Sequence, residues 1–155
     1  MKKIAMMLLV PALAGCLGAP PKPPVNWTIE VATDAKVASV VVCAPYGGQR
    51  LAVLRQDGSI AFDPCNSFAA APAAILKDAV SARRGEGALV VRKLALDCRA
   101  EGRRDAVVEL EVALGDRTGR GSAAEPTAGG NYTAAFSTAF EKAFEQARKE
   151  LGTAK

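Results

Sequence analysis

The sequence predicts a single α+β domain, with an antiparallel or mixed sheet of five or six strands and two helices packed on one face. Three observations predict it. The chain has 155 residues, enough for one hydrophobic core and too few for two. Several short stretches alternate apolar and polar residues or are rich in β-branched residues, as strands are. Two longer stretches carry apolar residues at helical spacing.

The first residues have the features of a secretory signal peptide. Lys2 and Lys3 are followed by the apolar run Ile4–Val10 and by small residues. That run is far shorter than the roughly 20 residues that span a bilayer. Leu13-Ala14-Gly15-Cys16 resembles the bacterial lipobox, which implies cleavage after residue 15, a lipid on the Cys16 thiol and acylation of the new amino group. The alternative is an ordinary signal peptide with a chance cysteine.

The predicted mature chain then divides into a tether, residues 16–25, and a folded domain, residues 26–152. The tether is rich in proline from Leu17 to Pro24, which favours an extended spacer of about 3.1 Å per residue. Because several acyl chains make membrane attachment stable, we expect the domain to be held at a membrane surface. Leu17, rather than aspartate, follows the cysteine, and by resemblance to enterobacterial sorting this favours the periplasmic face of the outer membrane over the inner membrane.

The first half of the domain reads as strands. Asn26–Thr33 alternates and predicts a half-buried strand, whereas Lys36–Cys43 is almost wholly apolar and predicts a central strand covered on both faces. Leu51–Gln56 and Ser59–Phe62 flank Asp57-Gly58, a pair typical of a hairpin turn in which both central residues have positive φ.

The second half combines two helices with two long strands. Pro72–Arg84 predicts a helix that Gly85 ends, and Ala88–Asp97 and Ala106–Leu114 predict strands. Gly115–Gly130 predicts a flexible loop that contains at most a short edge strand. Thr133–Leu151 predicts a helix whose stripe of Phe136, Phe140 and Phe144 suits a core; the alternative is a stripe that contacts lipid or a partner helix.

Composition excludes several kinds of chemistry. The chain contains no histidine, which removes Ser-His-Asp and Cys-His nucleophile systems, histidine bases and nearly all zinc and copper sites. Glu109 and Glu111 point the same way along a predicted strand, but such alternation is ordinary for a solvated face. We therefore expect no enzyme activity, no cofactor and no metal site.

Charge and aromatic content also argue against nucleic acid as a partner. Removal of residues 1–15 leaves 18 basic and 16 acidic residues, a net charge of +2, and aromatic residues are only 5% of the chain. The remaining clusters of arginine fall in predicted turns or at helix ends, where we expect solvated loop charges: Arg83, Arg84, Arg103, Arg104, Arg117 and Arg120.

Three cysteines remain in the folded domain, and the predicted compartment is oxidising. Cys43, Cys65 and Cys98 allow one disulfide and one free thiol, and spacing alone cannot choose the pair. Cys65–Cys98 is preferred because both residues lie at predicted ends of elements, and closing that loop would stabilise the fold by ~3–4 kcal/mol.

The order of these segments resembles the ABC-type transport auxiliary lipoproteins, the PqiC-like family that accompanies MCE-type lipid transporters. Arg50–Phe62 is similar to the family's strand and turn before its first helix, and Asp63–Pro72 to the short segment that opens that helix. Two long strands and a terminal helix rich in alanine and phenylalanine complete the likeness. The resemblance implies a non-enzymatic periplasmic helper of a lipid-transport assembly.

Three functions follow as hypotheses. The first is an adaptor subunit whose partners are an MCE-domain protein and an ABC permease and ATPase. The second is a carrier that holds a phospholipid between the sheet and the helix of Phe136–Phe144. The third is a regulatory lipoprotein of cell-envelope synthesis. The sequence assigns only Cys16 a role; the transported cargo, the oligomeric state and the residues that contact a partner or lipid stay unassigned.

Overall fold

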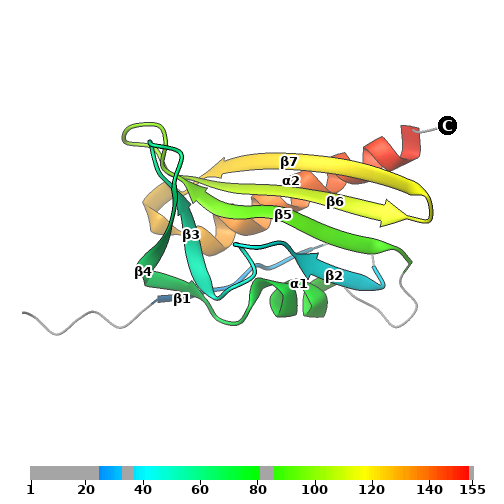
Figure 1. Cartoon of the computed structure of the whole chain (residues 1–155), viewed down its shortest axis with the longest axis horizontal. Coiled ribbons are helices and arrows are strands. Elements are labelled where there is room, and N and C mark those ends of the chain that lie inside the picture. The colour runs from blue at the N-terminus through cyan, green and yellow to red at the C-terminus, as the bar shows by residue number, and fades with distance from the viewer. Residues whose placement is uncertain (1–24, 33–36, 81–85, 154–155) are drawn as a thin grey trace, which may run out of the picture.

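The computed structural model describes residues 25–32, 37–80 and 86–153 and shows a mixed seven-stranded sheet with two helices, a single α+β domain as predicted. Figure 1 shows the long helix α2 running behind β6 and β7. The elements in chain order are β1 (Val25–Trp27), β2 (Ser39–Val42), β3 (Arg50–Leu54), β4 (Ile60–Phe68), α1 (Pro72–Val80), β5 (Ala88–Asp97), β6 (Asp105–Leu114), β7 (Arg117–Pro126), a 3-10 turn (Ala128–Gly130) and α2 (Tyr132–Thr153).

Six strands form one continuous path in the order β1-β4-β3-β5-β6-β7, and β2 pairs with β5 beside that path. The β3–β4, β5–β6 and β6–β7 pairs are antiparallel, whereas β1–β4, β2–β5 and β3–β5 are parallel. β2 and β3 therefore share one edge of β5, with β2 along its first half and β3 along its second. The two ends of the path are β1 with β4 and, on the opposite side, β7.

The core lies between the sheet and α2. Alternate residues of β6 from Ala106 to Val112 are buried, as strand periodicity requires. Phe136 and Phe140 are fully buried and Phe144 is 3% exposed, so the phenylalanine stripe is core. The edge-on contact of Phe68 with Phe136, with ring centroids 5.6 Å apart, joins β4 to the same cluster. Both helices contribute buried side chains to this one core.

The predicted hairpin is confirmed, but its turn is wider than expected. The Arg55 amide donates to the Ser59 carbonyl at 2.9 Å, and only Gly58 has a positive φ, +80°. The carboxylate of Asp57 accepts hydrogen bonds from the Ser59 amide at 2.9 Å and the Ser59 hydroxyl at 2.6 Å. The Gly58 amide also donates to the Arg55 carbonyl at 2.9 Å, so a three-residue turn, supported by the Asp57 side chain, replaces the two-residue turn that the sequence predicted.

Two N-terminal predictions were only partly right. The half-buried strand predicted over 26–33 pairs in the sheet only as far as Trp27; residues 28–32 bind α2 instead. The central strand predicted over 36–43 is the four-residue β2, in which Ser39 and Val41 are exposed. The apolar run was misleading because β2 has only one neighbouring strand and one covered face.

The largest correction concerns residues 115–130, predicted as a flexible loop. They contain β7, a ten-residue strand that pairs with β6 from Arg117 to Pro126. Gly119 and Gly121 concealed it, since glycine weakens an isolated strand pattern. In the fold these glycines are required: a Cβ at Gly121 would lie 1.7 Å from the Ala143 carbonyl oxygen of α2, and one at Gly119 2.0 Å from that of Ala147. The predicted helix end at 81–84 lies outside the described residues.

Candidate functional surface

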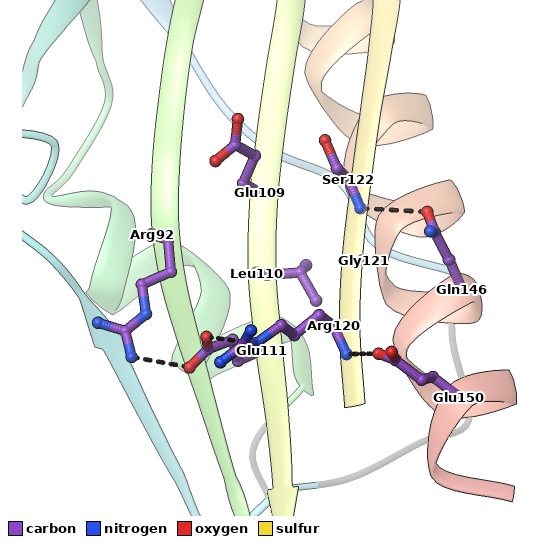
Figure 2. Close-up of a pocket in the computed structure, with 9 residues that line it drawn as sticks. All are labelled: Arg92, Glu109, Leu110, Glu111, Arg120, Gly121, Ser122, Gln146 and Glu150. Carbon is purple, nitrogen blue, oxygen red and sulfur yellow. Dashed lines mark hydrogen bonds and ion pairs between the residues drawn. The ribbon is translucent and has the colours of Figure 1, made fainter. Parts of the chain in front are cut away.

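Ion pairs cover the surface of β5, β6 and β7 that lies away from the buried residues of those strands. The Arg92 guanidinium lies 2.7 Å from one carboxylate oxygen of Glu111, and the Arg120 guanidinium lies 3.0 Å from the other. Figure 2 shows the two arginines meeting this carboxylate from neighbouring strands. Lys93 pairs with Glu109 in the next row. We call these five side chains the ion-pair surface.

The strand register explains why these charges meet. Glu111 stands opposite Arg120 in the β6–β7 ladder, and Lys93 stands opposite Glu109 in the β5–β6 ladder. Directly opposed side chains of opposite charge on one face of an antiparallel pair attract each other. The two arginines hold the pKa of the Glu111 carboxyl below its usual range, chiefly through the hydrogen bond from Arg92. Glu111 therefore stays ionised and accepts hydrogen bonds.

A shallow depression of about 300 Å³ lies beside these ion pairs and reaches the edge of β7 (Figure 2). Besides the charged residues it is lined by Leu110, Gly121, Ser122, Gln146 and Glu150. Glu111 is held by two arginines and Glu109 is paired with Lys93. The arrangement presents charges of both signs in fixed positions beside the depression.

Side chains of α2 cover the outer edge of β7. The backbone amide of Ser122 donates to the Gln146 side-chain oxygen at 3.2 Å, and the amide of Arg120 donates to the Glu150 carboxylate. Lys142 pairs with Glu125 at 2.5 Å further along the strand. The contacts of Gln146 and Glu150 occupy backbone donors that would otherwise be available to an added strand.

The opposite flank of α2 binds the extended segment after β1 in the same way. The amides of Glu30 and Ala32 each donate at 2.8 Å to side-chain oxygens of Ser137 and Glu141, and the amide of Thr28 donates to the Thr133 hydroxyl at 3.4 Å. The acceptors lie four residues apart, so they share one face of the helix, and the donors lie two residues apart, so their amides point the same way along the segment. Ile29 between them is buried. The segment that follows the predicted tether is thereby fixed to α2.

The structure places the predicted cysteines apart. Cys16 lies outside the described residues. Cys43, Cys65 and Cys98 are free thiols, and the preferred Cys65–Cys98 disulfide is not formed. Cys65 is on β4 and Cys98 directly follows β5, and these two strands flank β3 on opposite sides. Two strand spacings exceed 9 Å, as each is about 4.8 Å, whereas a disulfide requires Cα atoms within about 7 Å. Burial raises the pKa of the Cys98 thiol.

Sequence reasoning missed the partners of the paired glutamates. Glu109 and Glu111 do share a face, as predicted, but Arg120 was assigned to a loop because β7 was not recognised. Arg103 does lie in the β5–β6 turn, where it pairs with Asp105 at 2.7 Å. The period-two alternation of Arg120 and Ser122 with Gly119 and Gly121 was the one available signal.

The part of the chain that the structure describes contains neither a metal-binding cluster nor a membrane-spanning helix. No group of three or more metal-ligating side chains lies together in residues 25–32, 37–80 and 86–153. Within the same residues, neither helix has the length and apolar character needed to cross a membrane.

Comparison with known proteins defines the class of fold. No family model and no curated protein matches the chain. It is similar to the crystal structure of protein XCC0632 from Xanthomonas campestris, of family DUF330, with a TM-score of 0.52 and 21% identity over 83% of this chain and 82% of that one. It is also similar to the crystal structure of an uncharacterized protein, with a TM-score of 0.51 and 13% identity over 83% of this chain and 97% of that one. At these identities the likeness concerns the fold.

Proposed function

We propose that the protein is a membrane-anchored periplasmic lipoprotein that acts as a non-catalytic adaptor subunit of an ABC/MCE-type lipid-transport system. The observation that carries the proposal is the order of its parts: Leu13-Ala14-Gly15-Cys16, then a proline-rich tether, then one α+β domain. This order, together with the segment Arg50–Pro72, is what resembles the auxiliary lipoproteins.

The fold and surface support an adaptor rather than an enzyme. The chain shares its fold with XCC0632 over most of its length, which is compatible with one scaffold that several proteins use. The ion-pair surface presents both signs of charge in fixed positions on rigid strands, which favours specific docking over general attraction to an anion. The absence of histidine from the whole sequence limits the available chemistry.

In this proposal the anchor sets where the domain works. Cys16 carries the acyl chains, and the nine residues from there to Val25 span at most about 32 Å when fully extended. Backbone hydrogen bonds from residues 28–32 to side chains of α2 connect the tether to the folded domain. The domain is thus held close to one membrane, where its ion-pair surface binds an MCE-domain protein of an assembly that also contains the permease and ATPase.

Affinity purification of the lipidated full chain tests this assignment. We expect the preparation to recover an MCE-domain protein, a permease or an ATPase, and the Cys16→Ser variant to lose both membrane attachment and this recovery. A matched surface variant, Arg120→Glu, reverses one charge beside Glu111 and is expected to weaken recovery while leaving attachment unchanged. Recovery of cell-envelope synthesis enzymes alone would instead support the regulatory hypothesis.

One observation favours the lipid carrier as a second candidate. Near Phe144 the interface of sheet and helix opens into a depression of about 280 Å³, whose lining combines apolar side chains such as Leu114 and Leu151 with the charged Glu86 and Arg148. This volume is just below the range of about 300–1,000 Å³ that is usual for ligand sites. Toward Phe136 and Phe140 the interface is filled, so a lipid chain has room only at this end. Native mass spectrometry after mild extraction tests it: a bound lipid that Leu151→Trp displaces supports the carrier, and a lipid-free mass contradicts it.

A further inference from the structure

Exposed apolar side chains gather on the two strands nearest the predicted tether. Among the described residues four large hydrophobic side chains are exposed, and three of them, Val25, Ile60 and Phe62, lie on β1 and β4. Ile60 is 39% exposed and Phe62 43% exposed. Because they are two residues apart on one strand, their side chains project from the same face. The fourth, Val41, lies on β2, which pairs with β5 instead.

Among the described residues, the outer backbone edge beside Ile60 and Phe62 is also open. The amide of Cys98 donates to the Leu54 carbonyl, so this carbonyl of β3 points toward β5. Leu54 stands opposite Ile60, and the backbone groups of Ile60 therefore point away from β3. On that outer side β1 pairs with β4 only from Asn66 to Phe68. No described strand covers the outer side of β4 from Ile60 to Cys65. Figure 1 shows β4 and β1 together at this end of the sheet.

The length of chain before Val25 brings this edge within reach of the membrane. Val25 stands opposite Asn66, and Phe62 is four residues from Asn66 along β4, about 13 Å at strand spacing. The nine residues from Cys16 to Val25 span up to about 32 Å. The anchored chain thus ends directly beside the strand that carries the exposed pair.

We propose that the β4 edge is the side of the domain that contacts the bilayer, with Ile60 and Phe62 inserted at the level of the lipid headgroups. The proposal rests on the lipid anchor of the proposed function. An aliphatic and an aromatic side chain beside an anchor provide the second, weaker membrane contact that one attachment point lacks. At headgroup depth water still reaches the open amide and carbonyl groups of Ile60 and Phe62, which the hydrocarbon interior would leave unsatisfied.

Other occupants fit the edge less well. A second copy that paired along Ile60–Cys65 would join only about six residues from each chain, well under the 20–30 residues per side of a stable interface. Neither Ile60 nor Phe62 lines any of the depressions at the ion-pair surface or along α2, so a partner side chain would find no pocket beside them there. A lipid surface requires no pocket.

Tryptophan quenching tests the contact in the lipidated full chain. The variants Ile60→Trp and Phe62→Trp, with Val41→Trp as the matched control, are reconstituted into vesicles of phosphatidylethanolamine and phosphatidylglycerol with acyl-brominated phosphatidylcholine. Emission is compared with that of the parent, which contains Trp27 alone. We expect the added emission at positions 60 and 62 to be quenched at least about twofold more than that at position 41. Equal quenching at all three positions on vesicle-bound protein would overturn the proposal.

A second arm separates this proposal from the anchor itself. The same variants, carrying an N-terminal hexahistidine in place of residues 1–16, are bound to vesicles that contain nickel-chelating lipid. Stronger quenching at 60 and 62 in this arm supports the edge contact even where the Cys16 anchor fails. Equal quenching there contradicts the contact even where the anchor holds. Cross-linking of two copies through position 62, without quenching, would identify a second copy as the occupant and overturn the membrane contact.

Discussion

The strands on the two sides of the sheet, β7 and β4, differ in how their outer backbone edges are covered. On β7 the outward amides of Arg120 and Ser122 are bound by side chains of α2, whose backbone lies against Gly119 and Gly121. On β4 the stretch Ile60–Cys65 has no described strand on its outer side, away from β3, and two of its side chains are exposed and apolar.

This difference indicates that the edge of β7 is protected from association and that the edge of β4 is available for a contact. An exposed edge promotes association between chains, and natural sheets cover or charge such edges. Here α2 covers the longer edge, a ten-residue strand that would otherwise be the stronger template. On β4, β1 covers Asn66–Phe68, and the Asp63 carboxylate accepts the amides of Cys65 and Asn66 at 2.8 and 3.0 Å. The open stretch is short and lies beside the predicted tether, which fits the membrane contact proposed above.

The largest expected effect comes from separating α2 from β7. In Gly121→Ala the new Cβ would meet the backbone carbonyl of Ala143, which cannot rotate away. We expect the free energy of unfolding to fall by about 3 kcal/mol or more, although alanine is the better strand former. Gly48→Ala is the matched control, since a Cβ there has no atom within 4 Å and the backbone φ is ordinary. Urea titration of both variants measures the effect, and equal stability would contradict the close packing.

Removal of one amide acceptor from the covered edge should have a smaller effect. Gln146→Ala leaves the Ser122 amide without its 3.2 Å partner, so we expect a loss of about 1 kcal/mol and faster hydrogen exchange at that amide. Glu145→Ala, one residue earlier on the exposed face, removes only a helical pair with Lys149 and should change stability by about 0.5 kcal/mol or less. Exchange at Ser122 that is unchanged in Gln146→Ala would show that the edge is not covered in solution.

The ion-pair surface beside the covered edge should be sensitive to acid. The pKa of Glu111 is lowered in the folded chain, so its contribution to stability is present above the ordinary glutamate pKa of about 4.3 and is lost as the pH falls through the lowered value. Glu111→Gln should cost about 0.5 kcal/mol at neutral pH and nothing in strong acid. Unfolding measured from pH 7 to pH 2 checks this, and parallel curves for parent and variant would contradict the pairing.

These edges also show how far the sequence could be interpreted. The long strands β5 and β6, the hairpin and α2 were predictable because each carries its own periodicity and its own stop signal. β7 was not, because Gly119 and Gly121 are required by contacts with Ala147 and Ala143 of α2, far along the chain, and a local pattern contains no trace of those contacts. For the same reason Arg120 and Gln146 could not be assigned to the candidate surface. The disulfide preference failed on strand order, which places β3 between Cys65 and Cys98.

The smallest effect is expected at the open edge. Ile60→Thr keeps a β-branched side chain at a position that has only one neighbouring strand, so we expect the free energy of unfolding to change by less than about 0.5 kcal/mol. The same kind of change in the middle of the sheet, Val108→Thr, places a hydroxyl at a fully buried position and should cost about 1–3 kcal/mol. Thermal unfolding of the two variants side by side gives the contrast. If Ile60→Thr destabilised the fold as much as Val108→Thr, then β4 would be covered in solution by a segment of the chain, and its apolar pair would not be available to a membrane.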